Sequence, residues 1–106
     1  MARILLADDD ATTRDMVKRA LESDGHIVHV TQDGSEALER IKAAGATLDL
    51  LVSDVEMPML DGIALAEAAH ELQPRLRILL MSGFSDQLER AKSLKGQQVG
   101  MLSKPF

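Results

Sequence analysis

Acidic residues and one lysine directly follow apolar segments that have the length of β-strands. They are Asp8, Asp9, Asp10, Asp54 and Lys104. In an open parallel sheet, the carboxyl ends of the strands form the ligand crevice, so these side chains can converge there. Clustered carboxylates suit a hard cation such as Mg2+, and a carboxylate can also attack phosphorus and form an acyl phosphate. We therefore predict a site that binds Mg2+ and accepts a phosphoryl group on a carboxylate.

Each of these residues also has a structural explanation when it is taken alone. Asp10 suits the N-cap of the next helix, Asp54 suits a strand end before a proline-bounded loop, and Lys104 suits a surface turn. Three adjacent acids at a strand end nevertheless repel one another unless something neutralises them. The combination of acids and lysine therefore favours chemistry more than any single motif does.

Ser82 adds a hydroxyl to the same edge, because it closes the fourth apolar segment. A hydroxyl at this position can donate a hydrogen bond to a phosphoryl oxygen, and Gly83 leaves its approach open. The structural alternative is a cap for the following helix, a role that Ser85 fits better.

Length and composition limit the functions that the chain can have. The 106 residues fit one domain, residues 1–106, and the hydrophobic fraction of 45% is typical of a globular protein. The net charge of −5 argues against a nucleic-acid surface, which needs clustered Lys and Arg. No apolar run approaches the roughly 20 residues of a membrane span, and the start Met1-Ala2-Arg3 shows no leader, so we expect a cytoplasmic protein without membrane partners.

The chain alternates apolar segments with helix-like segments. The expected strands are residues 3–7, 26–30, 49–53, 77–81 and 99–103. The expected helices run from Asp10 to Gly25, from Gly34 to Gly45, from Asp61 to Pro74 and from Ser85 to Lys95. The apolar face of the first helix consists of Met16, Val17, Ala20 and Leu21. This alternation predicts an α/β, doubly wound, flavodoxin-like fold with a five-stranded parallel sheet in the order 2-1-3-4-5.

The joint pattern from Arg3 to Phe106 resembles the receiver domain of bacterial two-component response regulators. The matching features are an acid pair after the first strand, an Asp after the third, Met-Pro followed by Asp-Gly, a Ser after the fourth strand and Lys-Pro after the fifth. The resemblance implies a phosphoprotein that catalyses only its own phosphorylation and dephosphorylation. The phosphoryl donor would be a histidine kinase or a histidine phosphotransferase.

The resemblance also implies a role for each matching residue. Asp54 would carry the phosphoryl group as 4-aspartylphosphate, and Ser82 and Lys104 would contact it. Mg2+ would be held by Asp9 directly, by Asp8 largely through water, by Asp54 and by the main-chain carbonyl of Glu56.

Two features depart from the family pattern. Met101 stands where the family often has a Tyr or Phe that rotates on activation, so we expect a differently built switch of Ser82 and Met101, with Phe84 carrying part of the surface change. The family fold also ends in a helix after Lys-Pro-Phe, and that final helix is absent from these 106 residues. Apolar surface beside the first and fifth strands would then be exposed, and we expect self-association or low stability.

The two ends of the sequence resemble the CpdR-type single-domain regulators of alphaproteobacteria, which act in cell-cycle control. That resemblance implies a phosphorylation-controlled adaptor whose output partner is the ClpX component of the ClpXP protease. The alternatives are a phosphorelay intermediate that passes phosphate to another histidine protein, a small phosphohydrolase with Asp54 as nucleophile and Glu56 as acid, and a phosphorylation-independent scaffold.

Overall fold

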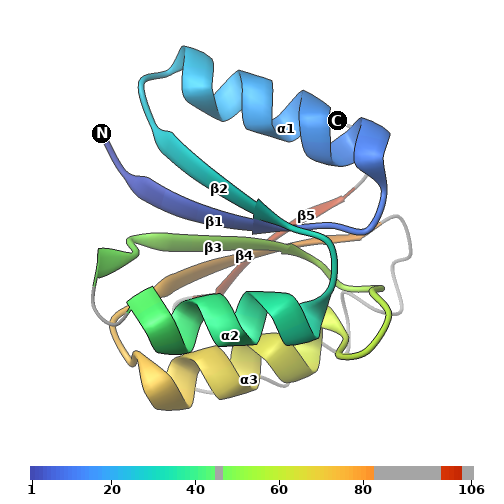
Figure 1. Ribbon diagram of the computed structural model, residues 1–106, viewed down its shortest axis with the longest axis vertical. Helices are drawn as coiled ribbons and strands as arrows, with labels where there is room; N and C mark the ends of the chain where they lie inside the picture. The colour runs from blue at the N-terminus through green and yellow to red at the C-terminus, as the bar shows by residue number, and fades with distance from the viewer. Residues whose placement is uncertain (45–46, 83–98, 104–106) are drawn as a thin grey trace.

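The computed structural model describes residues 1–44, 47–82 and 99–103 (Figure 1). Its strands are β1 (Arg3–Ala7), β2 (Ile27–Thr31), β3 (Leu50–Asp54), β4 (Arg77–Ser82) and β5 (Val99–Ser103). Its helices are α1 (Ala11–Ser23), α2 (Gly34–Ala44) and α3 (Gly62–Leu72). The helix expected over 85–95 and the residues after Ser103, where the final helix was expected to be absent, lie outside the described part of the chain. None of the described helices is long and apolar enough to cross a membrane.

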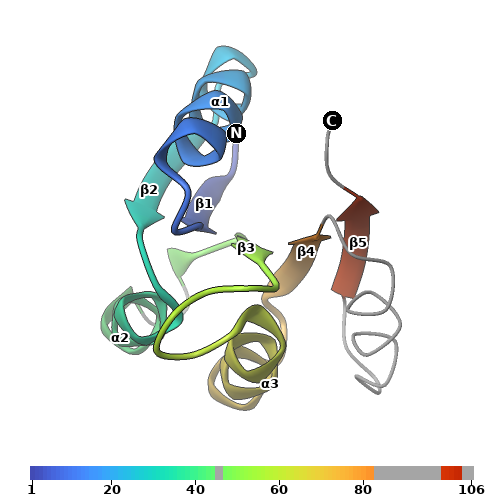
Figure 2. The ribbon, with the colours of Figure 1, turned by 90° about the vertical axis from the view of Figure 1, so that its right-hand side faces the viewer.

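All neighbouring strands run parallel, in the order β2-β1-β3-β4-β5. Figures 1 and 2 show α1 on one face of this sheet and α2 with α3 on the other face. The flavodoxin-like fold and the strand order predicted from the sequence are therefore confirmed. The interior position of β1, between β2 and β3, agrees with its composition, because Ile4, Leu5, Leu6 and Ala7 are all at most 1% exposed.

The strand register lines up the positions at the carboxyl edge of the sheet. Ala7 pairs with Ser53, so that Asp8 and Asp54 each follow this pair. Asp54 in turn pairs with Met81, and Ser82 pairs with Ser103. The backbone thus brings the ends of β1, β3, β4 and β5 side by side.

The two faces of the sheet are covered unequally. The face under α2 and α3 holds the larger cluster of buried side chains, including Ile41, Leu65 and Leu80. On the face under α1, only Val17 of the helix is buried. On the predicted apolar face of α1, Val17 is buried, whereas Met16 is 48% exposed and Ala20 is also exposed. This helix packs mainly over β1 and β2.

Two strands begin one residue later than predicted, and a side chain bonds the neighbouring chain segment just before each of them. The carboxylate of Asp49 accepts the Arg3 N–H at 2.8 Å just before β3, and the ladder between β1 and β3 starts at Ile4 and Leu50. Similarly, the ring Nδ1 of His26 accepts the Ala2 N–H at 3.0 Å just before β2. The end of β3 also differs from the prediction by one residue, since Asp54 still pairs with Met81 and is the last residue of the strand.

The predicted helix ends agree with the structure where it describes them. Asp10 is the N-cap of α1 and Asp61 is the N-cap of α3. Gly25 follows the C-cap of α1 with a φ of +88°, a left-handed conformation that glycine adopts without strain. These caps fix where each helix meets the loops that carry the acids.

Candidate metal and phosphoacceptor site

Three carboxylates converge at the carboxyl edge of the sheet. Asp8, Asp9 and Asp54 each offer an oxygen, and these oxygens all lie within 4.8 Å of one another. Asp8 is fully buried and Asp54 is only 9% exposed, whereas Asp9 is exposed. The cluster therefore has an inner wall of two buried acids and one acid open to solvent.

Asp8 is anchored through both its backbone and its side chain. Its N–H donates to the carbonyl of Thr31 at 3.2 Å, and its Oδ1 accepts the N–H of Asp10 at 2.9 Å. Its carbonyl oxygen accepts a hydrogen bond from Nη1 of Arg14 at 2.9 Å. The bond from the Asp10 N–H orients the Asp8 carboxylate, and the other two bonds fix the backbone that carries it.

Asp10 serves the helix rather than the acid cluster. Its Oδ2 accepts the Thr13 hydroxyl at 2.6 Å, and its Oδ1 accepts the Thr12 N–H at 3.3 Å. An N-cap carboxylate satisfies a backbone donor that the helix leaves unpaired, and it is also favoured by the helix dipole. The structure thus shows Asp10 as the N-cap of α1, and the three carboxylates that converge are those of Asp8, Asp9 and Asp54.

The second acidic loop connects Asp54 to α3 and is held by close backbone packing. The N–H of Gly62 donates to the carbonyl of Val55 at 2.8 Å, so the chain turns back on itself within residues 55–62. A Cβ atom added at Gly62 would lie 2.1 Å from the carbonyl oxygen of Asp54. A Cβ atom added at Gly34, the first residue of α2, would lie 1.9 Å from the carbonyl oxygen of Leu60. Only glycine allows these two approaches.

Met59 sits in this loop with an unfavourable backbone conformation. Its φ is +73°, in the left-handed region that a residue with a Cβ adopts at a cost of about 1–2 kcal/mol. Its side chain is 81% exposed. The rest of the loop must therefore impose this conformation, because the exposed Met59 side chain makes little contact that could offset the cost.

The other residues predicted for the site are only partly described. The side chain of Glu56 is exposed, and its carboxylate is not part of the three-acid cluster. Ser82 ends β4 and Met101 lies in β5, paired with Leu80, so both backbones have the strand positions expected for them. Phe84 and Lys104 lie outside the described residues.

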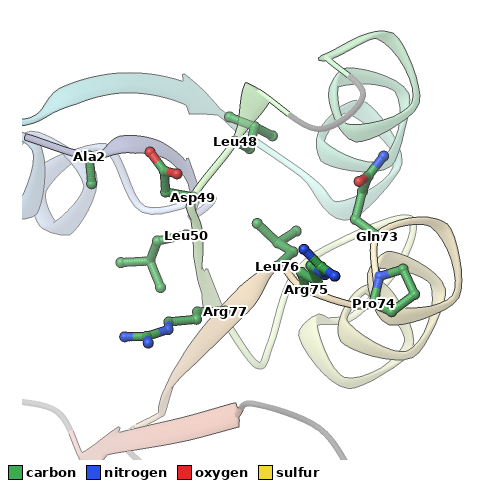
Figure 3. Close-up of a pocket in the computed structure, with 9 residues that line it drawn as sticks. All are labelled: Ala2, Leu48, Asp49, Leu50, Gln73, Pro74, Arg75, Leu76 and Arg77. Atoms are coloured by element: carbon green, nitrogen blue, oxygen red, sulfur yellow. The ribbon is translucent and has the colours of Figure 1, made fainter.

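The opposite edge of the sheet has a different character. An open hollow of about 850 Å³ lies there, at the amino ends of β3 and β4 (Figure 3). Its lining includes the apolar residues Leu48, Leu50 and Leu76, together with Arg75 and Arg77. This hollow lacks clustered carboxylates, so neither a hard cation nor a carboxylate nucleophile is favoured at this edge.

The donor set at the carboxyl edge fits Mg2+. Hard oxygen ligands from one or two carboxylates are typical of protein Mg2+ sites, which usually keep several waters. Two buried carboxylates beside a third would repel one another strongly, and a divalent cation removes that repulsion. The exposure of Asp9 leaves the cluster open to water and to an incoming group.

Comparison with known proteins identifies the family. The sequence profile of the response regulator receiver domain matches residues 4–106. The chain belongs to this family. The resemblance inferred from the acids, the Met-Pro and Asp-Gly pairs and the Lys-Pro ending is thus confirmed. Receiver domains bind Mg2+ at an acidic pocket, and they interact with histidine kinases or phosphotransferases.

Individual relatives refine this assignment. The response regulator receiver protein CpdR of Brucella abortus (strain 2308) is 39% identical over the whole chain, which covers 87% of that protein. The crystal structure of the receiver domain of the hybrid histidine kinase CckA is 32% identical, with a TM-score of 0.82, over 98% of this chain and 86% of that one. TrrA of Thermotoga maritima, solved with Mg2+ and BeF, is 26% identical with a TM-score of 0.87, over 100% of this chain and 89% of that one. The chain is thus a CpdR-like receiver.

Sequence reasoning missed three residues that shape the site. Arg14 stands four positions after Asp10, a spacing that indicates an acid–base pair on a helix but not a bond to the carbonyl of Asp8. Gly34 was recognised only as a helix start, and its contact with Leu60 depends on tertiary packing. Met59 carries no local signal, because left-handed positions usually hold glycine or asparagine.

Proposed function

We propose that residues 1–106 act as one receiver domain that accepts a phosphoryl group on Asp54 in a Mg2+-dependent reaction. The observation that carries this proposal is the convergence of the Asp8, Asp9 and Asp54 oxygens within 4.8 Å at the carboxyl edge of the sheet. The receiver family pattern assigns the nucleophile to the acid that follows the third strand, and here Asp54 ends β3 and is only 9% exposed.

The reaction is a transfer of the phosphoryl group between two side chains. A carboxylate oxygen of Asp54 attacks phosphorus, the P–O bond forms and the P–N bond to the donor histidine breaks. The histidine nitrogen keeps the electron pair of the broken bond and takes a proton from solvent. In-line positioning and neutralisation of the oxygen charges supply most of the catalysis in such transfers.

The neighbouring groups would supply that positioning and charge. Asp9, Asp8 through water, Asp54 and the main-chain carbonyl of Glu56 would hold Mg2+, which neutralises phosphoryl oxygens when bound. Lys104 would add a fixed positive charge beside the phosphoryl group, and the Ser82 hydroxyl would donate a hydrogen bond to it. The strand positions of Ser82 and Ser103, paired at this edge, support this assignment.

The donor would be a histidine kinase or histidine phosphotransferase in the cytoplasm. The output would be a change in a protein-binding surface, in which Ser82 moves toward the phosphoryl group and Met101 and Phe84 follow. Such a small shift can select between two packed states of one surface. Because the chain is CpdR-like, the partner we favour is ClpX, with the unphosphorylated chain as the adaptor form in cell-cycle control.

A phosphorelay intermediate is the second candidate. The observation that favours it is the similarity to the receiver domain of the hybrid histidine kinase CckA. In that role, Asp54 would pass its phosphoryl group to a histidine of another protein, and the partner surface would matter less than the lifetime of the acyl phosphate.

The first experiment is intact-mass analysis after incubation with Mg2+ and acetyl phosphate. We expect the parent chain to gain one phosphoryl group that hydroxylamine removes, and we expect Asp54→Asn to gain none. Asp49→Asn is the matched control, because it removes the same charge from the opposite edge of the sheet and should still be phosphorylated. Labelling of Asp54→Asn, or none of the parent even with a phosphorylated histidine protein, would contradict the proposal.

The output is tested with purified ClpX. We expect the unphosphorylated chain to bind and the phosphorylated chain to bind more weakly, whereas Asp54→Asn should bind regardless of donor. Equal binding of both forms would remove the switch, and return of phosphate to a histidine phosphotransferase without any ClpX binding would favour the relay.

A further inference from the structure

Arg14 connects α1 to the acid cluster through a bond that has no part in the helix itself. Its Nη1 donates to the carbonyl oxygen of Asp8 at 2.9 Å, across a sequence separation of six residues. The side chain is half-buried, so this bond is partly shielded from water. A charged donor makes a stronger hydrogen bond than a neutral one.

The bonded carbonyl belongs to the peptide group that joins Asp8 to Asp9. This peptide is planar, so a bond to its carbonyl fixes the orientation of the whole plane. On one side of the plane, Asp8 is already held by Thr31 and by the N–H of Asp10. On the other side lies Asp9, whose exposed side chain points its oxygen to within 4.8 Å of the other two carboxylates.

We infer that Arg14 is a positioning residue for Mg2+: it holds the Asp8–Asp9 peptide so that the exposed carboxylate of Asp9 faces Asp54. Loss of this bond removes one restraint on the peptide that joins Asp8 to Asp9, and a change in that plane moves Asp9. Residues that orient a ligand without touching the metal typically change metal affinity about tenfold or more. The inference rests on the proposed Mg2+ site.

The sign of the effect separates positioning from charge. If Arg14 acted only as a positive charge, its removal would reduce repulsion of Mg2+ and would tighten binding. If it orients Asp9, its removal weakens binding although the site becomes more negative. Arg19 provides the matched control, because it lies on the same helix, is exposed and carries the same charge, and its bond to Ser23 involves its backbone carbonyl and not its side chain.

The test is calorimetric titration of Mg2+ into the parent chain, Arg14→Met, Arg14→Lys and Arg19→Met. We expect Arg14→Met to weaken the Kd about tenfold, Arg14→Lys to weaken it less because lysine restores a charged donor, and Arg19→Met to leave it unchanged or slightly tighter. At saturating Mg2+, phosphorylation of Arg14→Met by acetyl phosphate should recover most of the parent rate, because the defect lies in binding.

Three outcomes would overturn or redirect the inference. Binding to Arg14→Met that is as tight as, or tighter than, binding to Arg19→Met refutes positioning. No Mg2+ binding by the parent refutes the proposed site itself and not the role of Arg14 within it. If Arg14→Met does not fold by circular dichroism, the comparison becomes Arg14→Lys against Arg19→Lys, and equal Kd values there refute the inference.

Discussion

The two loops that carry the acids are held in place by different means. The loop after β1 is a polar network, in which Asp8, Asp10 and Arg14 exchange hydrogen bonds between side chains and backbone. The loop after β3 is held by contact, because Gly34 and Gly62 bring two helices against its backbone at distances that exclude a Cβ atom. The loop after β1 is therefore held by hydrogen bonds, whereas the loop after β3 depends on two positions that have no side-chain atoms.

This difference indicates which changes each loop tolerates. The polar loop should accept a change of size that keeps its donors and acceptors, whereas the packed loop should accept a change of polarity that adds no atoms. Both arrangements hold the three carboxylates together before any ligand binds, so little ordering is required when a cation arrives. The substitutions below test the comparison.

Gly62→Ala should have the largest effect on stability. The new Cβ would lie 2.1 Å from the carbonyl oxygen of Asp54, which belongs to β3 and cannot yield without disturbing the central sheet. We expect a loss of about 3 kcal/mol in the free energy of unfolding, at the upper end of overpacking costs. Urea unfolding followed by far-ultraviolet circular dichroism measures it, with Glu67→Ala on the same helix as control. Unchanged stability would show that the loop is not packed as closely as we describe.

Gly34→Ala should have a smaller effect on stability and a larger one on the loop. Its Cβ would meet the carbonyl of Leu60 at 1.9 Å, but Leu60 lies in the loop and can shift. We expect a loss of about 2 kcal/mol, together with weaker Mg2+ binding because the loop includes Glu56. Ser35→Ala, next to it on an exposed position, is the control. A loss of stability with unchanged Mg2+ affinity would separate this contact from the site.

Asp10→Ala tests the polar loop. It removes the N-cap of α1 and the bond to Thr13, and we expect a loss of about 1 kcal/mol. Asp10→Asn keeps an oxygen for the cap while removing the charge, so it should lose much less. Equal losses in the same unfolding assay would mean that charge, and not capping, is the contribution of Asp10.

Met59→Gly should have the smallest effect, and it should be stabilising. Relief of the left-handed strain, about 1 kcal/mol at the lower end, exceeds the entropic cost of glycine, which is roughly 0.5 kcal/mol at its lower end. We expect a net gain of about 0.5 kcal/mol, whereas Met59→Ala keeps the strain and should leave the stability unchanged. A gain in Met59→Ala as large as in Met59→Gly would place the cause in the exposed side chain.

The fold was predictable because its strands carry strong local signals. The apolar run of β1 is buried on both faces, so its central position followed from composition. Strand limits were less predictable: β2 and β3 begin just after His26 and Asp49, whose side chains bond the neighbouring chain segment in a way that composition does not report. The periodicity of α1 places Met16 and Val17 on one face, but their different exposure depends on what packs against each side of the helix and not on periodicity.

The site was predictable as a set of positions, but not as a set of contacts. The acids that end β1 and β3 had to meet once the strands were parallel neighbours, and Asp10 had two roles open to it until the cap was seen. Arg14 and Gly34 act through tertiary contacts with the backbone of distant residues, which no local pattern reports. The strain at Met59 arises from the return of the chain between Asp54 and Gly62, a three-dimensional constraint.

The pairing of Ala7 with Ser53 has a consequence for how the gene can change. Deletion or insertion of one residue within β1 or β3 would shift the register of the two strands and turn the side chains of one strand to the opposite face of the sheet. Asp8 and Asp54 would then no longer lie side by side, even if the sheet still formed. The exposed connection at Pro74 and Arg75 lies at the other edge, where added length moves no acid. Among related sequences, we therefore expect changes of length to accumulate at that edge and to be rare within the two strands that end in the acids.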